Sequence, residues 1–266
     1  MEMNMAKAIL TDNGIMADQT VVHKNGRTLD ALTIGEGSVK PTLYEEHLVN
    51  LHNEEEMMEF ARRVLNQTPT CDMSDIFTKE YFLSHVISCI RPQFDDSETL
   101  CHPVYGDLQE YYRVLIDFRF HDDSYASVVV QRSHLLHLGI TQTELRKAAR
   151  RNLRMRAQIK PMSEILAELM GCEAPDLPDS NQFMYIASTV EHVQGASVML
   201  LDDLLREFCL ERGISSVTII PASIHEIILV TETHDSEQID AMIREVNSTT
   251  VSEMERLSDH SYTFHV

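Results

Sequence analysis

Hydrophobic and polar residues are arranged most distinctively in the run from Ser216 to Glu232, SVTIIPASIHEIILVTE. Two β-branched stretches, Val217–Ile220 and Ile224–Val230, flank a short connection containing Pro221, which is typical of two strands joined by a turn. Successive strand side chains point to opposite faces, and both faces of the second stretch are apolar beyond its first two residues. The pattern therefore predicts a central strand that is covered on both sides.

A strand–strand–helix unit recurs along the C-terminal part of the chain. The predicted strand pairs are 112–120 with 125–132, 183–188 with 196–200, and 217–220 with 224–230. A helix with apolar residues at helical spacing follows each pair, and the first of these begins with a capping box at Thr141 and Glu144. A short helix over 161–171 and a terminal edge strand over 262–266 complete this part. These units predict an α+β fold, mainly antiparallel sheet with helices packed on it, largely on one face.

The N-terminal part has a different pattern. Asn25-Gly26 between two apolar stretches predicts a hairpin over 21–34, because this dipeptide supplies the positive φ angles of a tight turn. Helices are expected from Asn53 to about residue 68, and over 78–91. The polar stretch 93–110 is predicted to be a loop. We therefore divide the chain into an N-terminal hairpin-plus-helices part, 1–110, and a repeat domain, 111–266, which could pack as one domain.

Composition places the chain in the ordinary soluble globular class, with 43% hydrophobic and 24% charged residues. No apolar run approaches the roughly 20 residues of a membrane helix, and the N-terminus does not resemble a signal peptide. The 5 cysteines are odd in number and widely spaced, without a CxxC pair. This spacing argues against a disulfide framework or a zinc ribbon, so we expect a cytoplasmic protein.

Charge is unevenly distributed in this acidic chain. The net charge of −20 opposes binding to nucleic acids or anionic membranes, yet residues 144–156 hold six Lys or Arg and one Glu. In the predicted helix, Lys147, Arg150, Arg151 and Arg154 form a cationic outer face. This face could dock an acidic partner, but we favour a solvated face balanced by the acidic remainder of the chain. Replacing the three arginines with Gln should then leave the fold intact.

His225, with Glu226 and Ser223, is the candidate catalytic group. A histidine that titrates near neutrality and is oriented by a carboxylate can transfer protons. Adjacent strand residues point to opposite faces, however, so His225 and Glu226 cannot meet without a bulge. We favour a structural role, in which His225 is buried and hydrogen-bonded to backbone or to a hydroxyl such as Ser223. Its replacement by Ala should then cost over about 1 kcal/mol.

The sequence gives little indication of a metal or cofactor site. His134 and His137 have a plausible metal spacing in a helix, but no third ligand is nearby in the sequence, and zinc needs at least three protein ligands. Glycine-rich phosphate loops, nucleophile elbows and HExxH motifs are absent from the sequence. We therefore expect no cofactor.

Seven blocks of the sequence carry a resemblance to a known family. They are KNGRTLDALTIGEG, PTLYEEHL, YRVLIDFRF, SVVVQRSHLLHLGITQTEL, PASIHEIILV, MIREVNSTTV and LSDHSYTF. In order and spacing they resemble a bacterial family catalogued as domain of unknown function number 5688. The resemblance runs from about Lys24 to the C-terminus. It implies a cytoplasmic α+β protein and carries over no catalytic residues.

Three functional hypotheses remain open. The first is a non-catalytic binding or regulatory protein that recognises another macromolecule, most simply a protein, because the sequence shows no convergent polar cluster. The second is a hydrolase or transferase centred on His225. The third is an acidic mimic of nucleic acid that occupies a nucleic-acid-binding partner, since the chain carries a net charge of −20. The sequence does not indicate the oligomeric state.

Overall fold

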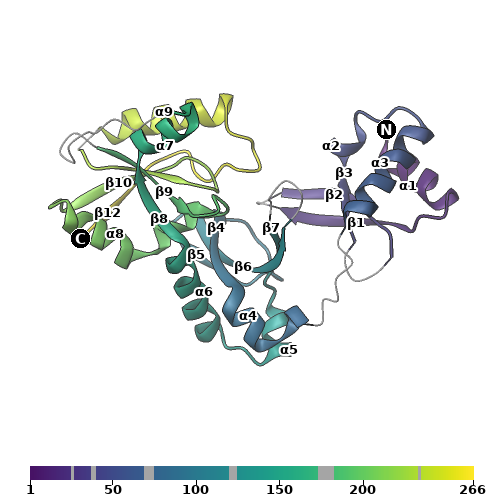
Figure 1. Cartoon of the computed structure of the whole chain (residues 1–266), viewed down its shortest axis with the longest axis horizontal. Coiled ribbons are helices and arrows are strands. Elements are labelled where there is room, and N and C mark those ends of the chain that lie inside the picture. Colours follow the sequence, from purple (N-terminus) through teal and green to yellow (C-terminus); the bar gives the residue numbers. More distant parts are fainter. Residues whose placement is uncertain (25–26, 37–39, 69–74, 120–124, 173–182, 233–234) are drawn as a thin grey trace. The chain divides into compact units, whose positions relative to one another are not determined.

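The computed structural model describes residues 1–24, 27–36, 40–68, 75–119, 125–172, 183–232 and 235–266 (Figure 1). The chain divides into two compact units, Met1–Thr78 with Phe118–Ser124, and Lys79–Asp117 with Tyr125–Val266. The first division along the chain falls between Thr78 and Lys79. The polar stretch 93–110 had instead suggested a boundary at residue 110, which lies inside strand β6 (Leu108–Arg119).

The first unit packs helices against a three-stranded antiparallel sheet. Its elements are α1 (Met3–Asp12), β1 (Ala17–Lys24), β2 (Arg27–Ile34), β3 (Thr42–Tyr44), α2 (Glu45–Leu48), α3 (Glu54–Gln67) and the short η1 (Asp75–Phe77). The order β1-β2-β3 confirms the predicted hairpin, although Asn25-Gly26 lies outside the described residues. The side chain of Asn53 accepts a hydrogen bond from the backbone N–H of Glu56 at 2.9 Å, which confirms the predicted start of α3. The sequence pattern did not reveal α1, whose Ala6 and Leu10 are buried in this unit's core.

The predicted helix over 78–91 is wrong in its second half. Helix α4 (Lys79–His85) ends early, and the chain continues directly into strand β4 (Val86–Pro92), where six of the seven residues are buried. The side-chain amide of Asn152 donates to the carbonyls of Leu83 and Val86, at 3.1 and 2.8 Å, and so satisfies backbone acceptors at the junction. An apolar run buried on both faces fits helix and strand spacing alike.

A four-stranded antiparallel sheet follows. Its central path is β4-β6-β5, with β5 at Cys101–Val104, and β7 (Tyr125–Val129) also pairs with β6. Strands β6 and β7 confirm the predicted pair, whereas β5 occupies part of the stretch predicted to be a loop. Helices α5 (Arg132–Leu138) and α6 (Gln142–Arg156) come next.

A five-stranded antiparallel sheet forms the rest of the second unit, in the order β12-β10-β11-β9-β8. Its elements in chain order are β8 (Ala157–Pro161), α7 (Met162–Met170), β9 (Met184–Thr189), η3 (Gly195–Leu200), α8 (Asp202–Glu211), β10 (Ser216–Pro221), β11 (Ile227–Val230), α9 (Ser236–Thr249) and β12 (Tyr262–His265). Strand β11 is the middle strand, as predicted, and β12 is the predicted terminal edge strand.

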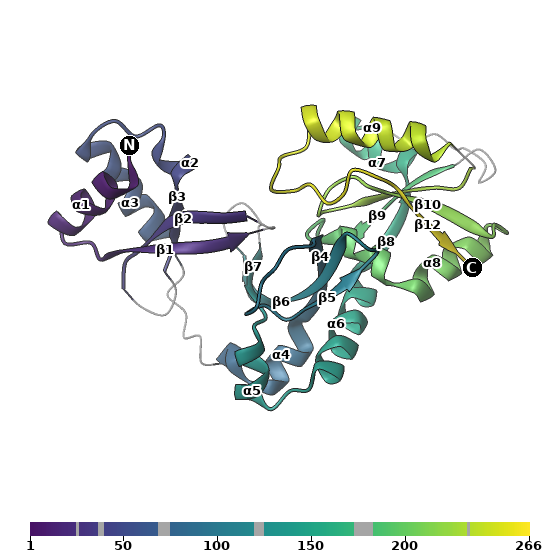
Figure 2. The same ribbon diagram turned by 180° about the vertical axis from the view of Figure 1, so that it is seen from behind.

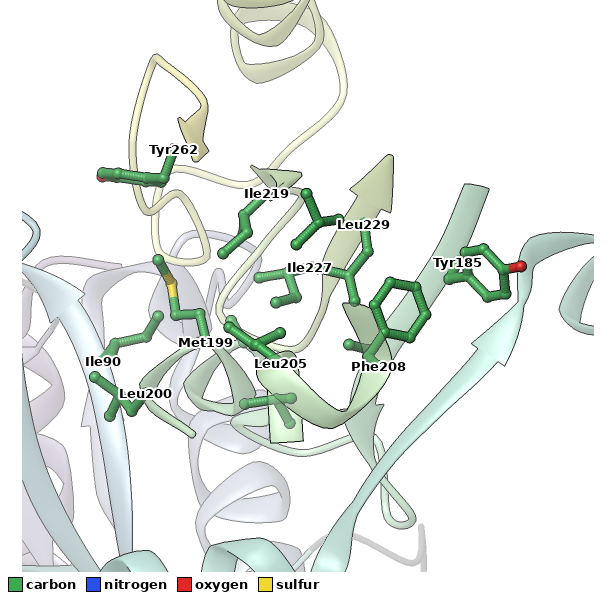
Figure 3. Close-up of a cluster of buried hydrophobic side chains, with 14 of the residues drawn as sticks. Ile90, Tyr185, Met199, Leu200, Leu205, Phe208, Ile219, Ile227, Leu229 and Tyr262 are labelled. Carbon is green, nitrogen blue, oxygen red and sulfur yellow. The ribbon is translucent and has the colours of Figure 1, made fainter. Parts of the chain in front are cut away.

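Helices cover both faces of this sheet, so the expectation of helices mainly on one face is wrong here. Ile219, Ile227 and Leu229 point towards α8 and η3, where Leu205 and Phe208 pack on them (Figure 3). The alternate strand residues point the other way, towards α9, which lies with α7 on the opposite side of the sheet (Figure 2). Strict alternation in two adjacent apolar strands produces this arrangement.

The segment predicted as a strand over 196–200 is the 3₁₀ helix η3, and all six of its residues are buried. Gly195 opens it at a point where a Cβ atom would collide with the Ser188 hydroxyl and the His225 carbonyl oxygen. This close backbone approach turns the chain into the core. Among the described residues, none of the helices combines the length and apolar composition that a bilayer crossing requires.

Candidate functional site

Helix α6 carries all four cationic side chains singled out from the sequence. It begins at the predicted capping box: Glu144 N–H donates to Thr141 Oγ1 at 3.2 Å, and Thr141 N–H donates to Glu144 Oε2 at 2.9 Å. Its inner face packs into the second unit through Leu145, Ala148, Ala149, Asn152 and Leu153, which are buried. Register and capping therefore fix which side chains point outward.

Glu110, on β6, is fully buried beneath α6. Its carboxylate accepts from the Ser88 hydroxyl at 2.8 Å and from Nε and Nη2 of Arg150, each at 3.2 Å. Arg146 Nη2 lies 3.1 Å from the same carboxylate. A buried carboxylate requires such multiple donors, because its desolvation is otherwise costly.

Arg150 is consequently a structural residue, and the prediction that it is solvated is wrong. Besides binding Glu110, it donates from Nη1 to the Leu200 carbonyl at 3.0 Å, which links α6 to the end of η3. Burial alone would lower the pKa of Arg150, but the hydrogen bonds and charge of Glu110 raise it above the ordinary arginine value. The sequence pattern could not anticipate this pair, because it placed Glu110 at the end of a loop.

The three remaining candidate cations of α6, Lys147, Arg151 and Arg154, fall into two groups. Arg154 donates to Glu207 Oε2 at 2.6 Å and lies 3.6 Å from Asp203 Oδ2, both on α8. Part of the basic face is therefore balanced by the chain's own acidic residues. Lys147 and Arg151 are exposed, and in the described part of the chain no carboxylate lies within ion-pair distance of either.

An open groove of about 430 Å³ lies between α6 and the start of α8, and we refer to it as the α6–α8 groove. The α6 wall contributes Arg150, Arg151, Arg154 and Met155, and the facing wall contributes Leu200, Leu201, Asp202 and Asp203. The two leucines are each 3% exposed, whereas Met155 is 72% exposed. The groove thus combines a cationic wall, an acidic wall and apolar surface. The sequence did not single out Met155 or the two aspartates as its lining.

His225 was predicted to lie on the strand over 224–230, but β11 begins two residues after it, at Ile227, so this part of the prediction is wrong. Its side chain is 36% exposed, so the prediction of a largely buried ring is wrong. The predicted hydrogen bond to backbone is present: Nδ1 lies 3.1 Å from the His192 carbonyl, which can only accept. Nε2 lies 3.8 Å from Glu255 Oε1, a partner that the sequence did not suggest.

Ser223 and Glu226 take structural roles in the same turn. The Ser223 hydroxyl accepts from the backbone N–H of His225 at 3.0 Å, and the Ser223 N–H donates to the Glu226 carbonyl at 3.2 Å. The His225 carbonyl accepts from Ser188 at 2.7 Å. The serine hydroxyl is thus engaged by the backbone, and an arrangement of Ser223 activated by the His225 ring is not formed.

His134 and His137 both lie on the short helix α5. His134 Nδ1 accepts from the backbone N–H of Gln131 at 3.2 Å, as part of the capping arrangement at the start of the helix. Burial and the neighbouring His137 together lower the pKa of His134. Within the described ranges, no group of three potential metal ligands is brought together at these or other positions.

A polar cluster around Asp107 was not anticipated. This carboxylate, in the turn between β5 and β6, accepts from the Tyr262 hydroxyl at 2.6 Å and the Ser258 hydroxyl at 2.8 Å, and lies 3.3 Å from His260 Nε2. Burial and the hydrogen bond to Asp107 raise the pKa of Tyr262. The cluster fastens the C-terminal segment to the four-stranded sheet, because its members come from both.

Together, the antiparallel sheets, their covering helices and the mixed-charge groove define an α+β protein with a candidate binding surface. The chain belongs to the family of unknown function DUF5688, whose family model matches residues 3–265, and the match confirms the resemblance seen in the sequence. No curated protein and no solved structure matches the chain.

Proposed function

We propose that this chain is a non-catalytic cytoplasmic binding or regulatory protein that recognises another protein through the outer face of α6. The observation that carries the proposal is the pair Lys147 and Arg151, which is exposed and unneutralised among the described residues. Other cations on α6 are paired with carboxylates. Exposed cations that no carboxylate neutralises, on a chain of net charge −20, favour an acidic partner, since charge complementarity steers association.

A hydrolase or transferase centred on His225 is the alternative that one observation favours. The ring is partly exposed and its Nε2 lies 3.8 Å from Glu255 Oε1, so it has access to solvent and a carboxylate beside it. Against it, the Ser223 hydroxyl is already engaged by backbone, and the ring's other nitrogen faces a carbonyl. The acidic mimic differs from the main proposal in requiring a nucleic-acid-binding partner.

Photo-crosslinking in the native host tests the proposal. A photoreactive amino acid placed at Arg151 should capture a protein that the same amino acid placed at Arg244, an exposed position on α9, does not capture. The captured protein is then purified and its affinity is measured. It should bind wild type and Arg244→Glu alike, but the Lys147→Glu/Arg151→Glu double variant at least about tenfold more weakly.

Other outcomes would contradict the proposal or shift it. Unchanged affinity in the double variant would remove α6 as the recognition surface. A captured nucleic-acid-binding protein that nucleic acid displaces would favour the mimic. Capture that depends on His225, together with turnover of a small substrate that is lost in His225→Ala, would favour the enzyme.

A further inference from the structure

Three exposed side chains form one ridge on the outer face of α6, inclined to the helix axis because each step of four residues also turns by about 40°. Lys147, Arg151 and Met155 lie at i, i+4 and i+8, and we call them the α6 stripe. Four residues of an α-helix advance by about 6 Å along its axis, so the three side chains emerge at regular intervals of that size. The stripe therefore presents two positive charges followed by one apolar side chain.

Met155 stands at the edge of the α6–α8 groove. It is 72% exposed, and the adjoining Leu200 and Leu201 form part of the groove lining. A single exposed apolar residue is common on protein surfaces and carries no meaning alone. Here it borders a groove of about 430 Å³ and lies in register with two unneutralised cations. Methionine is also a side chain that adapts readily to an incoming partner.

We propose that the α6 stripe and the α6–α8 groove bind an acidic segment of a partner protein, with two carboxylates on Lys147 and Arg151 and one large apolar side chain against Met155. This rests on the proposed function and adds the chemistry of the partner. In an extended segment, alternate residues are about 6.6 Å apart, which is close to the axial interval of about 6 Å along the stripe. The recognised pattern is therefore acidic-x-acidic-x-apolar.

The acidic wall of the groove restricts what can bind. Asp202 and Asp203, in the first turn of α8, face the cations of α6 across the groove. Arg154 Nε lies 3.6 Å from Asp203 Oδ2. A partner whose negative charge continued into the groove would meet these carboxylates. A polyanion such as duplex DNA has that continuous charge, whereas a segment ending in an apolar side chain does not. Like-charge contact thus discriminates against nucleic acid.

Peptide libraries test the proposal on the full chain. One library fixes Glu-x-Glu-x-Leu with random flanks, a second fixes Lys-x-Lys-x-Leu, and a third fixes Glu-x-Glu-x-Ser. Only the first should yield saturable binders by fluorescence anisotropy, and their affinity should fall as salt rises. The best binder should lose about tenfold affinity with Lys147→Gln/Arg151→Gln, and about fivefold with Met155→Ser. Arg244→Gln is the matched control and should change nothing.

Each contrary result bears on a separate claim. Equal binding of the Glu-x-Glu-x-Ser library, or an unaffected Met155→Ser variant, would overturn the apolar anchor while leaving protein recognition by α6 in place. Absence of binders in the first library would overturn this inference, but not a partner captured at Arg151. Displacement of the peptide by duplex DNA at physiological salt would contradict the claim that the ligand is a segment of a protein. Thermal midpoints close to wild type verify that every variant is folded.

Discussion

Arg91 illustrates how single residues in this protein hold buried charge. Its side chain is 5% exposed and lies 3.2 Å from Asp96 Oδ2, while its guanidinium packs over the rings of Phe94 and Tyr111, at 4.1 and 4.7 Å from their centroids. The planar guanidinium therefore pairs with one carboxylate and stacks on two aromatic rings at the same time. Asp96 also accepts from the backbone N–H groups of Glu98 and Thr99, each at 3.1 Å.

The Asp96 carboxylate should make stability depend on acidity. Burial would raise its pKa, but hydrogen bonds from Thr99, Arg91 and Glu98 outweigh it and lower the pKa to about 2. Because the folded-state pKa is below the unfolded value, the stabilisation is present above about pH 4 and is lost as pH falls towards about 2. We expect Asp96→Asn to cost about 2 kcal/mol near neutrality and almost nothing at about pH 2, measured by urea unfolding. A difference between wild type and variant that is constant with pH would contradict this.

At the scale of elements, α6 separates structural from surface cations within one turn. Arg150 reaches the buried Glu110 and the end of η3, whereas Arg151, its neighbour, points outward. The rotation of about 100° per residue in an α-helix is enough to change the environment from buried network to solvent. Sequence neighbours of the same type therefore have different roles.

Arg150→Gln and Arg151→Gln form a matched pair that tests this assignment. Arg150→Gln should lower the free energy of unfolding by more than about 2 kcal/mol, because it removes a partner from a buried carboxylate. Arg151→Gln should change it by less than about 0.5 kcal/mol, as expected for a solvated side chain. Adding Glu110→Gln to Arg150→Gln should recover part of the loss, since it removes a buried charge whose partners are then reduced to Arg146 and Ser88. Equal effects of the two single variants in chemical unfolding would refute the distinction.

At the scale of the whole molecule, each compact unit has a hydrophobic core of its own. In the first unit, Leu32, Ile34 and Met57 are among the buried residues of one cluster. In the second, Ile90 and Leu108 of the four-stranded sheet belong to the same cluster as Ile219 of the five-stranded sheet. The two sheets of the second unit therefore share one core, which is the usual basis for cooperative folding.

Residues 79–266 should accordingly fold when expressed alone. We expect a single cooperative thermal transition, with sheet and helix signals lost together, because the core of the second unit is complete in this range. The Arg150→Gln variant should destabilise this fragment about as much as it destabilises the full chain. Circular dichroism and calorimetry provide the measurement, and a fragment without a transition would show that the second unit depends on the first.

Local patterns were sufficient where one physical preference dominated. The hairpin over 21–34, the start of α3 at Asn53 and the capping box at Thr141 were predicted, because turn geometry and orphan N–H groups select particular residues. Strand β11 was predicted to be central, because both of its faces are apolar. Predictions failed at β4 and η3, where an apolar run is compatible with more than one conformation.

The candidate site was harder to predict than the fold, because it is built from contacts between residues that are distant in the sequence. The sequence by itself determined the α+β class, the central strand, and α6 with its cationic side chains, since periodicity and capping are local properties. Only the tertiary structure decided that Arg150 binds the buried Glu110, that His225 precedes its strand, and that Met155 borders a groove. The physical reason is that burial and pairing are set by the partner that packs against a residue, and that partner lies elsewhere in the chain.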